Sequence, residues 1–300
     1  MRLIRIVVMN ESLSSVSDGF AVPGYSLIEG PGGLPVVSLV NDHGVASIAL
    51  QGATVLSYRP SDEADVLYVS ESAVFSDGQP IRGGVPICFP WFGSHGTDAG
   101  KPSHGTVRTR AWELVGVHEH NGALTVRLTT REGVLAVAFE VTLGPRLGMS
   151  LEVEHTGRSG ESEVFEAALH TYLSVGDVSG ATVTGLEQTD YLDQLEGRRR
   201  LTQGDDPIVF EGEVDRIYLN TSATCVLHDP VFERSVAVDK DGSRSTVVWN
   251  PWIEKARRLA DLPDDAWQRF VCIETGNIAD NAVTLRAGER HRMAAALSVQ

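Results

Sequence analysis

Hydrophobic residues alternate with polar or small residues along most of this chain, and this period of two limits its fold more than any other feature. The segment VLAVAFEVTLG is an example, with larger apolar side chains at Leu135, Val137, Phe139, Val141 and Leu143. The segment that follows, GMSLEVEHTG, places acidic side chains at Glu152 and Glu154 between apolar ones. Such alternation is typical of a β-strand with one face on a core and the other in water.

Segments of this kind recur from about residue 36 to the end of the chain and are separated by Gly, Pro, Asn and Asp. They include GVASIALQGATVLSYRP, ALTVRLTTREG, ATCVLHDP, STVVWNPW and RMAAALSVQ. Helical periodicity is scarce, and IEKARRLADL (253–262) is its best example. Because the strands do not alternate with helices, the pattern predicts an all-β fold: a large antiparallel β-sandwich with few short helices.

The 300 residues are enough for one large domain or two ordinary ones. No stretch has the composition of a linker, since SGESE (159–163) and EGRRRLTQGDDP (196–207) have the character of surface loops. We therefore expect a single domain over residues 1–300. Residues 1–30 are expected to form a loose N-terminal extension or an edge strand. Their short apolar stretch is broken by Arg5 and lacks a signal-peptide cleavage site.

Composition excludes several classes of function. A net charge of -15 argues against a nucleic-acid surface, although a few local arginines can still bind a phosphate. The three cysteines, Cys88, Cys225 and Cys272, form no CxxC pair, which argues against a zinc ribbon and fits a reduced, cytoplasmic protein. No run reaches the roughly 18 apolar residues of a membrane span. The HEH at 118–120 is followed by Asn-Gly and predicts a hairpin turn, so no metal site is expected.

Two residues are candidates for acid–base chemistry. His170 lies in VFEAALHTYLSVGD, which has the pattern of one strand, and its face includes Glu166 and Tyr172. It is either a histidine on a wet sheet face or a general acid, since histidine titrates nearest to neutral pH. Glu274, in RFVCIETGN, shares a strand face with Phe270. A glutamate on an apolar face needs a partner, which is either a nearby arginine or a substrate.

Further polar residues are candidates for ligand binding. Arg82 precedes two glycines, so the backbone there can approach a ligand closely, and HGTVRTRAW brings His104 near Arg108. Two arginines on adjacent loops form either a bidentate anion site or a pair of exposed cations. Asp215 in EGEVDRIYLN has, from its local sequence alone, the pattern of a turn or strand-edge acid paired with Arg216.

Several of these segments, in this order, resemble those of the hexose-6-phosphate mutarotases. The motifs are IRGGVPICFPWFG, HGTVRTRAWEL, ALHTYLSVGD, GLEQTDYLD, EVDRIYL, VVWNPW and CIETGNI. This family is the glucose-6-phosphate 1-epimerase branch of the aldose 1-epimerase superfamily, and the resemblance runs from about residue 35 to the C-terminus. It implies a galactose mutarotase-like β-sandwich with an open cleft on one sheet, no metal and no cofactor.

The resemblance also implies roles for individual residues. It makes His170 the acid and Glu274 the base, and it gives Asp215 contacts to sugar hydroxyls. Arg82 and Arg108 would bind the phosphate, and His104 would lie near the ring oxygen. Relatives commonly carry glutamine at the position of Ser103. We expect the shorter serine to leave a hydroxyl contact to water or to widen the range of sugars that bind.

The predicted reaction exchanges the α and β anomers of a hexose 6-phosphate, with glucose 6-phosphate as the expected substrate. An ionised Glu274 would take the proton of the anomeric hydroxyl while a protonated His170 gives one to the ring oxygen. The alternatives are a general aldose 1-epimerase acting on free sugars, a non-catalytic carbohydrate-binding or regulatory protein, and a glycoside hydrolase using Asp215 with Glu274. We expect a monomer whose partner is a small sugar phosphate, without nucleic acid or membrane.

Overall fold

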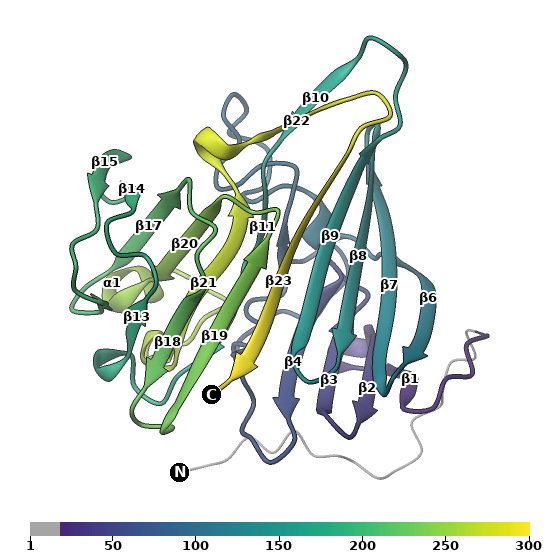
Figure 1. The fold of residues 1–300 in the computed structure, drawn as a ribbon, viewed down its shortest axis with the longest axis horizontal. Coiled ribbons are helices and arrows are strands. Elements are labelled where there is room, and N and C mark those ends of the chain that lie inside the picture. The colour runs from purple at the N-terminus through teal and green to yellow at the C-terminus, as the bar shows by residue number, and fades with distance from the viewer. Residues whose placement is uncertain (1–18) are drawn as a thin grey trace.

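The computed structural model describes residues 19–300, which fold mainly into antiparallel β-sheets (Figure 1). The largest sheet has nine strands. In spatial order these are β16 (Ile208–Val209), β13 (Thr182–Thr184), β18 (Cys225–Asp229), β19 (Arg234–Asp241), β23 (Arg290–Val299), β9 (Leu147–His155), β8 (Leu135–Leu143), β7 (Ala123–Glu132) and β6 (Glu113–His120). Figure 1 shows this sheet across the front of the molecule.

A second sheet has eight strands and lies behind the first in Figure 1. Its strands are β15 (Arg199–Thr202), β14 (Asp190–Asp193), β17 (Val214–Leu219), β20 (Ser245–Asn250), β21 (Phe270–Asn277), β11 (Ala167–Leu169) and β5 (Ile87–Cys88) in spatial order, with β12 (Tyr172–Ser174) also paired to β21. The long central strand β21 is buried over its whole length. It therefore has to be covered on both of its faces.

Two smaller sheets and a few short helices complete the described part of the chain. One sheet contains β1 (Tyr25–Glu29), β2 (Pro35–Asn41), β3 (Gly44–Ala49) and β4 (Thr54–Pro60), and the other pairs β10 (Ser162–Phe165) with β22 (Val283–Arg286). The helices are α1 (Trp252–Ala256) and the 3-10 turns η1 (Pro31–Gly33), η2 (Val107–Thr109), η3 (Val178–Gly180), η4 (Ala266–Arg269) and η5 (Ala279–Asn281). The all-β prediction is confirmed, and the helix expected over 253–262 is confined to α1.

The alternation in the sequence explains which side chains form the main core. In β8 and β9 the apolar residues at every second position are buried, while Glu152 and Glu154 face outward. This core joins the nine-stranded sheet to the eight-stranded and four-stranded sheets, and it contains Val37 and Ile48 as well as Val271. β1 forms the edge of the four-stranded sheet. Residues 1–18 lie outside the described residues, so the expectations for the N-terminal segment and for a single domain stay predictions.

β21 connects the main core to a second apolar cluster on the opposite face of the eight-stranded sheet. Val271 and Ile273 point into the main core, whereas Phe270 and Cys272 belong to the second cluster. Strand alternation gives Glu274 the same direction as Phe270 and Cys272. The face of the sheet that points away from the main core therefore carries a buried carboxyl group.

The segment around His170 is interrupted rather than continuous, contrary to the single strand that its sequence predicts. β11 ends at Leu169 and β12 begins at Tyr172. Both nevertheless pair with β21 in one register, since Leu169 lies opposite Thr275 and Tyr172 opposite Cys272. This register places His170 across from Glu274.

Candidate active site

The seven residues proposed from the sequence as catalytic or substrate-binding all line one cavity of about 450 Å³. The cavity lies on the face of the eight-stranded sheet that carries Glu274. Its lining comprises Arg82, Phe92, Gly93, Ser94, Ser103, His104, Arg108, His170, Gln194, Asp215, Val247, Trp249, Lys255, Leu259 and Glu274. Residues separated by up to about two-thirds of the chain are therefore brought to a single place.

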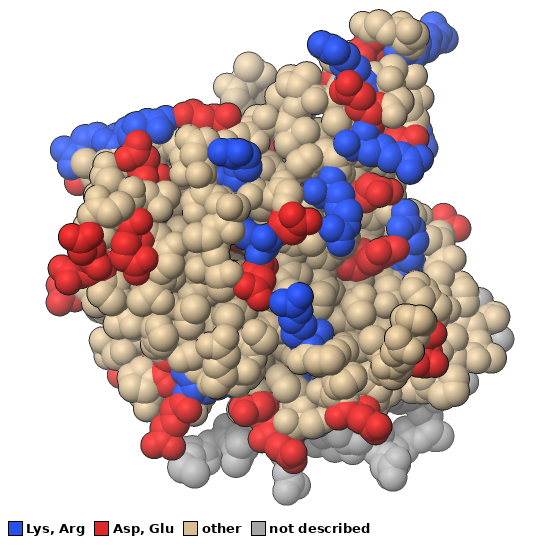
Figure 2. Space-filling view, in the orientation of Figure 1, with Lys and Arg blue, Asp and Glu red and all other residues tan. Residues whose placement is uncertain are grey.

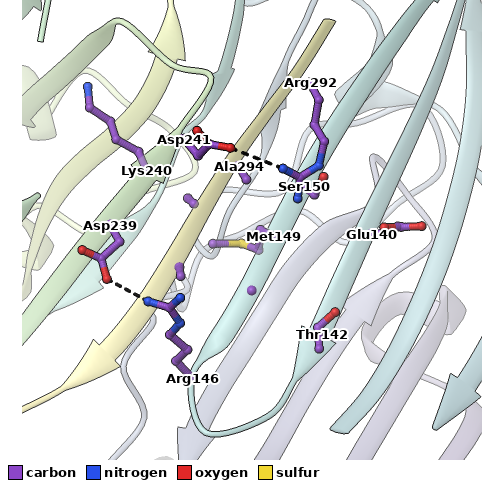
Figure 3. A pocket seen from close by; sticks show the side chains of 13 residues that line it. Glu140, Thr142, Arg146, Met149, Ser150, Asp239, Lys240, Asp241, Arg292 and Ala294 are labelled. Carbon is purple, nitrogen blue, oxygen red and sulfur yellow. Dashed lines mark hydrogen bonds and ion pairs between the residues drawn. The ribbon is translucent and has the colours of Figure 1, made fainter. Parts of the chain in front are cut away.

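A larger hollow of about 620 Å³ lies on the outer face of the nine-stranded sheet. Its arginines are paired with their own acids, Arg146 with Asp239 at 3.0 Å and Arg292 with Asp241 at 3.6 Å (Figure 3). Figure 2 shows basic and acidic side chains beside one another over this face. This hollow has no buried acid–base pair, so the smaller cavity is the stronger candidate for catalysis.

His170 and Glu274 are in direct contact at the cavity. The distance from His170 Nε2 to Glu274 Oε1 is 3.3 Å, and the two side chains are only 7% and 1% exposed. Glu274 therefore has a histidine as its partner rather than the arginine considered from the sequence. Within the described residues, His170 Nδ1 and Glu274 Oε2 are buried without a hydrogen-bond partner. A ligand with hydroxyl groups can supply such partners.

Burial moves the pKa values of this pair toward the neutral forms of both groups. The pKa of Glu274 lies well above its ordinary value, chiefly because the carboxylate is removed from water and also because Asp215 is near. The pKa of His170 lies well below its ordinary value, chiefly through burial and then through the positive charges around it. These two shifts favour an uncharged histidine beside a protonated glutamic acid, whereas the sequence-based mechanism expects an ionised pair.

Aromatic rings fix the orientation of His170. The ring of Tyr172 stacks on the imidazole at a centroid distance of 4.7 Å and an interplanar angle of 11°. Trp249 meets the imidazole edge-on at 5.7 Å, and His104 does so at 5.6 Å. Trp249 therefore lines the cavity and also holds the candidate acid in place, so its position is compatible with sugar stacking and with packing.

Arg82 is held by two partners that the sequence did not predict. Its Nε donates to Asp261 Oδ1 at 3.1 Å, and its Nη1 donates to the hydroxyl of Tyr172 at 3.1 Å. The guanidinium has five N–H groups, so these two bonds leave others for an anion in the cavity. Arg82 is thus a partly buried, fixed cation rather than an exposed loop residue.

Arg108 reaches the same cavity from η2. Its Nη2 donates to the backbone carbonyl of Ser103 at 2.8 Å. Within the described part of the chain its Nε is buried and has no hydrogen-bond partner. Ser103 contributes its carbonyl to this contact, and both residues line the cavity. An unpaired guanidinium N–H at a cavity is a donor available to an anionic ligand.

His104 has the properties of a neutral hydrogen-bond donor. The amide of Gly93 donates to His104 Nδ1 at 3.3 Å, and Cys88 Sγ lies 3.4 Å from the same nitrogen. Burial, followed by the charges of Arg108 and nearby cations, lowers the pKa of His104 to about 3. With Nδ1 accepting a hydrogen bond, the ring proton resides on Nε2. This residue can then donate to a sugar oxygen but is a poor proton-transfer group at neutral pH.

The backbone at His104 is also unusual. Its φ is 62°, and that of the next residue, Gly105, is 78°. A Cβ at Gly105 would lie only 1.8 Å from the carbonyl oxygen of Phe89. Glycine is therefore required beside His104 for the two loops to approach so closely.

Asp215 faces Lys255 rather than its neighbour Arg216. Lys255 Nζ lies 3.5 Å from Asp215 Oδ2 and 2.9 Å from Glu213 Oε1. Arg216 instead lies over the ring of Tyr191. Lys255 lies in α1, within the one segment that has helical periodicity, but nothing in its local sequence indicates an active-site position.

Glu166 connects two loops at the rim of the site. One of its carboxylate oxygens accepts the amide of Phe92 at 2.9 Å, and the other accepts the amide of Ala279 at 2.8 Å. The adjacent Gly93 accepts the amide of His104 at 2.7 Å. Glu166 thus holds the loop that in turn holds His104, a role that its strand position in the sequence does not reveal.

The described residues contain neither a metal-binding cluster nor a membrane-spanning helix. Across residues 19–300 no group of three or more His, Cys, Asp or Glu side chains has an arrangement that could hold a metal ion. His118 and His120 lie in β6, and the hairpin turn predicted after them is present, since β7 begins at Ala123. None of the helices in this part of the chain has the length and apolar character needed to cross a membrane.

The chain is similar to known proteins over most of its length. The family model described as aldose 1-epimerase matches residues 35–298. A protein of Cenchrus ciliaris named "Putative glucose-6-phosphate 1-epimerase" is 34% identical over 293 residues, which cover 92% of this chain and 88% of that protein. A protein of Escherichia coli K12 with the same name is 35% identical over 251 residues, or 82% of this chain and 84% of the relative.

Solved structures show the same similarity. The crystal structure described as "a putative mutarotase (YeaD)" from Salmonella typhimurium has a TM-score of 0.86 and 29% identity, and the match covers 96% of both chains. A galactose mutarotase-like protein from Lactobacillus casei, at 16% identity and a TM-score of 0.66 over 88% of this chain and 100% of the other, shares the fold. The family match, which spans most of the sequence, shows that this chain belongs to the aldose 1-epimerase family.

Proposed function

We propose that this protein interconverts the α and β anomers of a hexose 6-phosphate, with glucose 6-phosphate as its substrate. The observation that carries the proposal is the buried pair of His170 and Glu274, in contact at 3.3 Å at a cavity that also contains two arginines. Relatives that cover more than four-fifths of this chain carry the name of this activity. Family membership supports sugar chemistry, and the arginines support a phosphorylated sugar.

The reaction requires one proton donor and one acceptor. Glu274 takes the proton of the O1 hydroxyl, and His170 gives a proton to the ring oxygen O5, so that the C1–O5 bond breaks and an open-chain aldehyde forms. Rotation about C1–C2 exposes the other face of the aldehyde. Ring closure with the two roles reversed then gives the other anomer. Each proton-transfer step of this kind typically contributes about 10²–10⁴-fold to the rate.

The neutral pair that burial favours and the ionised pair of the mechanism contain the same number of protons. They differ only in whether the shared proton lies on Glu274 or on His170. The contact between Nε2 and Oε1 gives this proton a direct path between the two residues. A change in the surroundings that favours the charged form of His170 can move the proton along this contact.

The remaining residues have distinct roles in substrate binding. Arg82 and Arg108 bind the phosphate, since both line the cavity and retain N–H groups that no acceptor within residues 19–300 uses. Asp215, with Lys255 beside it, binds sugar hydroxyls. His104 donates from Nε2 to an oxygen near the ring. Water in the space left by the short side chain of Ser103 completes the contacts to the sugar.

The test is NMR exchange spectroscopy of the anomeric protons of glucose 6-phosphate, with and without the protein. Free glucose and galactose are measured in parallel, and Glu274→Gln is the control. We expect exchange to be faster for the phosphate and to lose its acceleration in the variant. Acceleration of free sugars alone would favour a general aldose 1-epimerase. Sugar binding without acceleration would favour a non-catalytic binding protein.

A further inference from the structure

Arg82 is connected to the acid–base pair by a short series of contacts. Its Nη1 donates to the hydroxyl of Tyr172 at 3.1 Å, and the ring of Tyr172 lies parallel to that of His170 at 4.7 Å. His170 Nε2 in turn contacts Glu274 Oε1 at 3.3 Å. The cation proposed to bind the phosphate therefore lies at the histidine end of the pair.

These contacts are held by packing. Tyr172 is fully buried, with the rings of Phe270 at 5.2 Å and Trp249 at 6.0 Å. Arg82 is fixed a second time by Asp261, at 3.1 Å from its Nε. Because both anchors are part of the folded framework, an anion that binds Arg82 meets a cation already in position. The electrostatic effect of the anion is therefore exerted at a defined distance from His170.

Arg82 is a neighbouring charge of His170. The groups that set the charge state of His170 are Glu274 in contact with it, Tyr172 stacked on it, and His104, Arg82 and Arg108 as neighbouring charges or potential charges. Both arginines lower the pKa of His170. Because Arg82 is joined to His170 through Tyr172, compensation of the Arg82 charge favours a proton on His170.

We propose that a phosphate group bound at Arg82 moves the shared proton from Glu274 Oε1 to His170 Nε2. One O–H bond breaks and one N–H bond forms, so a carboxylate and an imidazolium replace the neutral pair and no other reactant is needed. These are the charges that ring opening requires. The inference rests on the proposed function. It makes the phosphate an activator of the chemical step as well as a binding group, so a sugar without it loses kcat as well as affinity.

The experiment separates the sugar from its phosphate. Xylose, which lacks C6 and the phosphate, is the substrate, and phosphite dianion is added in trans. We expect saturating phosphite to raise the enzymatic anomer exchange of xylose by about tenfold or more, because one pKa unit corresponds to a tenfold change in protonation. Reactions without protein are subtracted, since phosphite is itself a weak acid–base catalyst. No activation of xylose, under conditions in which glucose 6-phosphate is exchanged rapidly, would overturn the inference.

Matched variants show whether activation passes through Arg82. Arg82→Gln should abolish activation by phosphite, and Tyr172→Phe, which keeps the ring but loses the anchoring hydroxyl, should reduce the activation ratio. Arg146→Gln removes the same charge on the outer face of the nine-stranded sheet, where Arg146 pairs with Asp239. This control should retain the full activation ratio. Equal activation in the Arg82 and Arg146 variants would contradict the proposal.

A spectroscopic measurement detects the proton directly. Infrared difference spectra of the protein without sugar should show loss of a protonated carboxyl band when phosphite is added, and Glu274→Gln should lack this band. In ¹⁵N-histidine NMR, one imidazole should change to the imidazolium pattern, and that signal should be missing in His170→Gln. Persistence of the carboxyl band with phosphite bound would overturn the inference. Failure to exchange glucose 6-phosphate would instead overturn the proposed function.

Discussion

His170 lies directly across from Glu274 in the eight-stranded sheet, because β11 and β12 keep one register along β21 although the chain is interrupted between them. The contact at 3.3 Å is thus a cross-strand pair of the kind that antiparallel sheets place side by side. The proposed acid and base are positioned by the backbone hydrogen bonds of this sheet. Replacement of either side chain should therefore change the chemistry with little change to the fold.

Glu274→Gln keeps the shape of the side chain and removes the base. We expect anomer exchange to fall about 10²–10⁴-fold, the usual contribution of a general base. The free energy of unfolding, in contrast, should increase. Burial raises the pKa of Glu274, so the unfolded chain ionises at lower pH than the folded one, and the wild type loses stability as pH rises above about 4.3. Denaturant unfolding at pH 5 and pH 8 should show that the variant has the higher free energy of unfolding and that the difference from the wild type increases with pH. A difference that decreases with pH would contradict this account.

Arg82→Ala should affect phosphorylated substrates selectively. A hydrogen bond to a charged group contributes about 1.5–3 kcal/mol, so we expect kcat/KM for glucose 6-phosphate to fall about 10–100-fold. The decrease in kcat/KM for free glucose should be much smaller, because glucose has no phosphate group for Arg82 to bind. Arg292→Ala, on the outer sheet face, is the matched control for the change in net charge. An equal loss for both sugars would remove the phosphate-binding role given to Arg82.

Glu166→Gln should loosen the loop that holds His104. The carboxylate accepts backbone amides of Phe92 and Ala279, and an amide side chain has only one oxygen with which to accept. A partly buried N–H would lose its partner, which costs about 1–3 kcal/mol of the free energy of unfolding. We expect lower stability together with a lower kcat/KM. Glu163→Gln, at an exposed position in β10, is the control and should match the wild type in both measurements.

Asp65→Asn tests a buried carboxyl group away from the site. Burial raises the pKa of Asp65 to about 6, and its Oδ1 accepts the amides of Tyr58 and Leu67 at 3.2 Å and 3.1 Å. Asparagine keeps this acceptor and lacks the charge. Because unfolded aspartic acid ionises near pH 3.9, the wild type should lose about 2 kcal/mol relative to the variant between about pH 4 and pH 6. Urea unfolding over this range measures the difference in free energy of unfolding between the two proteins. A difference that does not change with pH would show that ionisation of Asp65 is not its cause.

Many of the strands, and the strand face on which some candidate residues lie, could be predicted from the sequence. The alternation in 135–155 gave two long strands with their apolar faces inward, and the Asn-Gly after His120 gave the hairpin between β6 and β7. These features are local, since the direction of a strand side chain and the conformation of a tight turn depend on a few neighbouring residues. The same alternation placed Glu274 and Phe270 on one face of β21.

The sequence did not determine the partners or the charges of these residues. Asp261 holds Arg82 and Lys255 holds Asp215 because loops far apart along the chain meet over the same sheet, and no local pattern encodes such a meeting. The neutral pair has the same origin. From residue types alone, a histidine beside a glutamate is expected to be ionised, but burial of both groups reverses this preference. Residue identity thus set which groups are candidates for proton exchange, and only the tertiary structure, by excluding water from them, moved their pKa values toward the neutral forms.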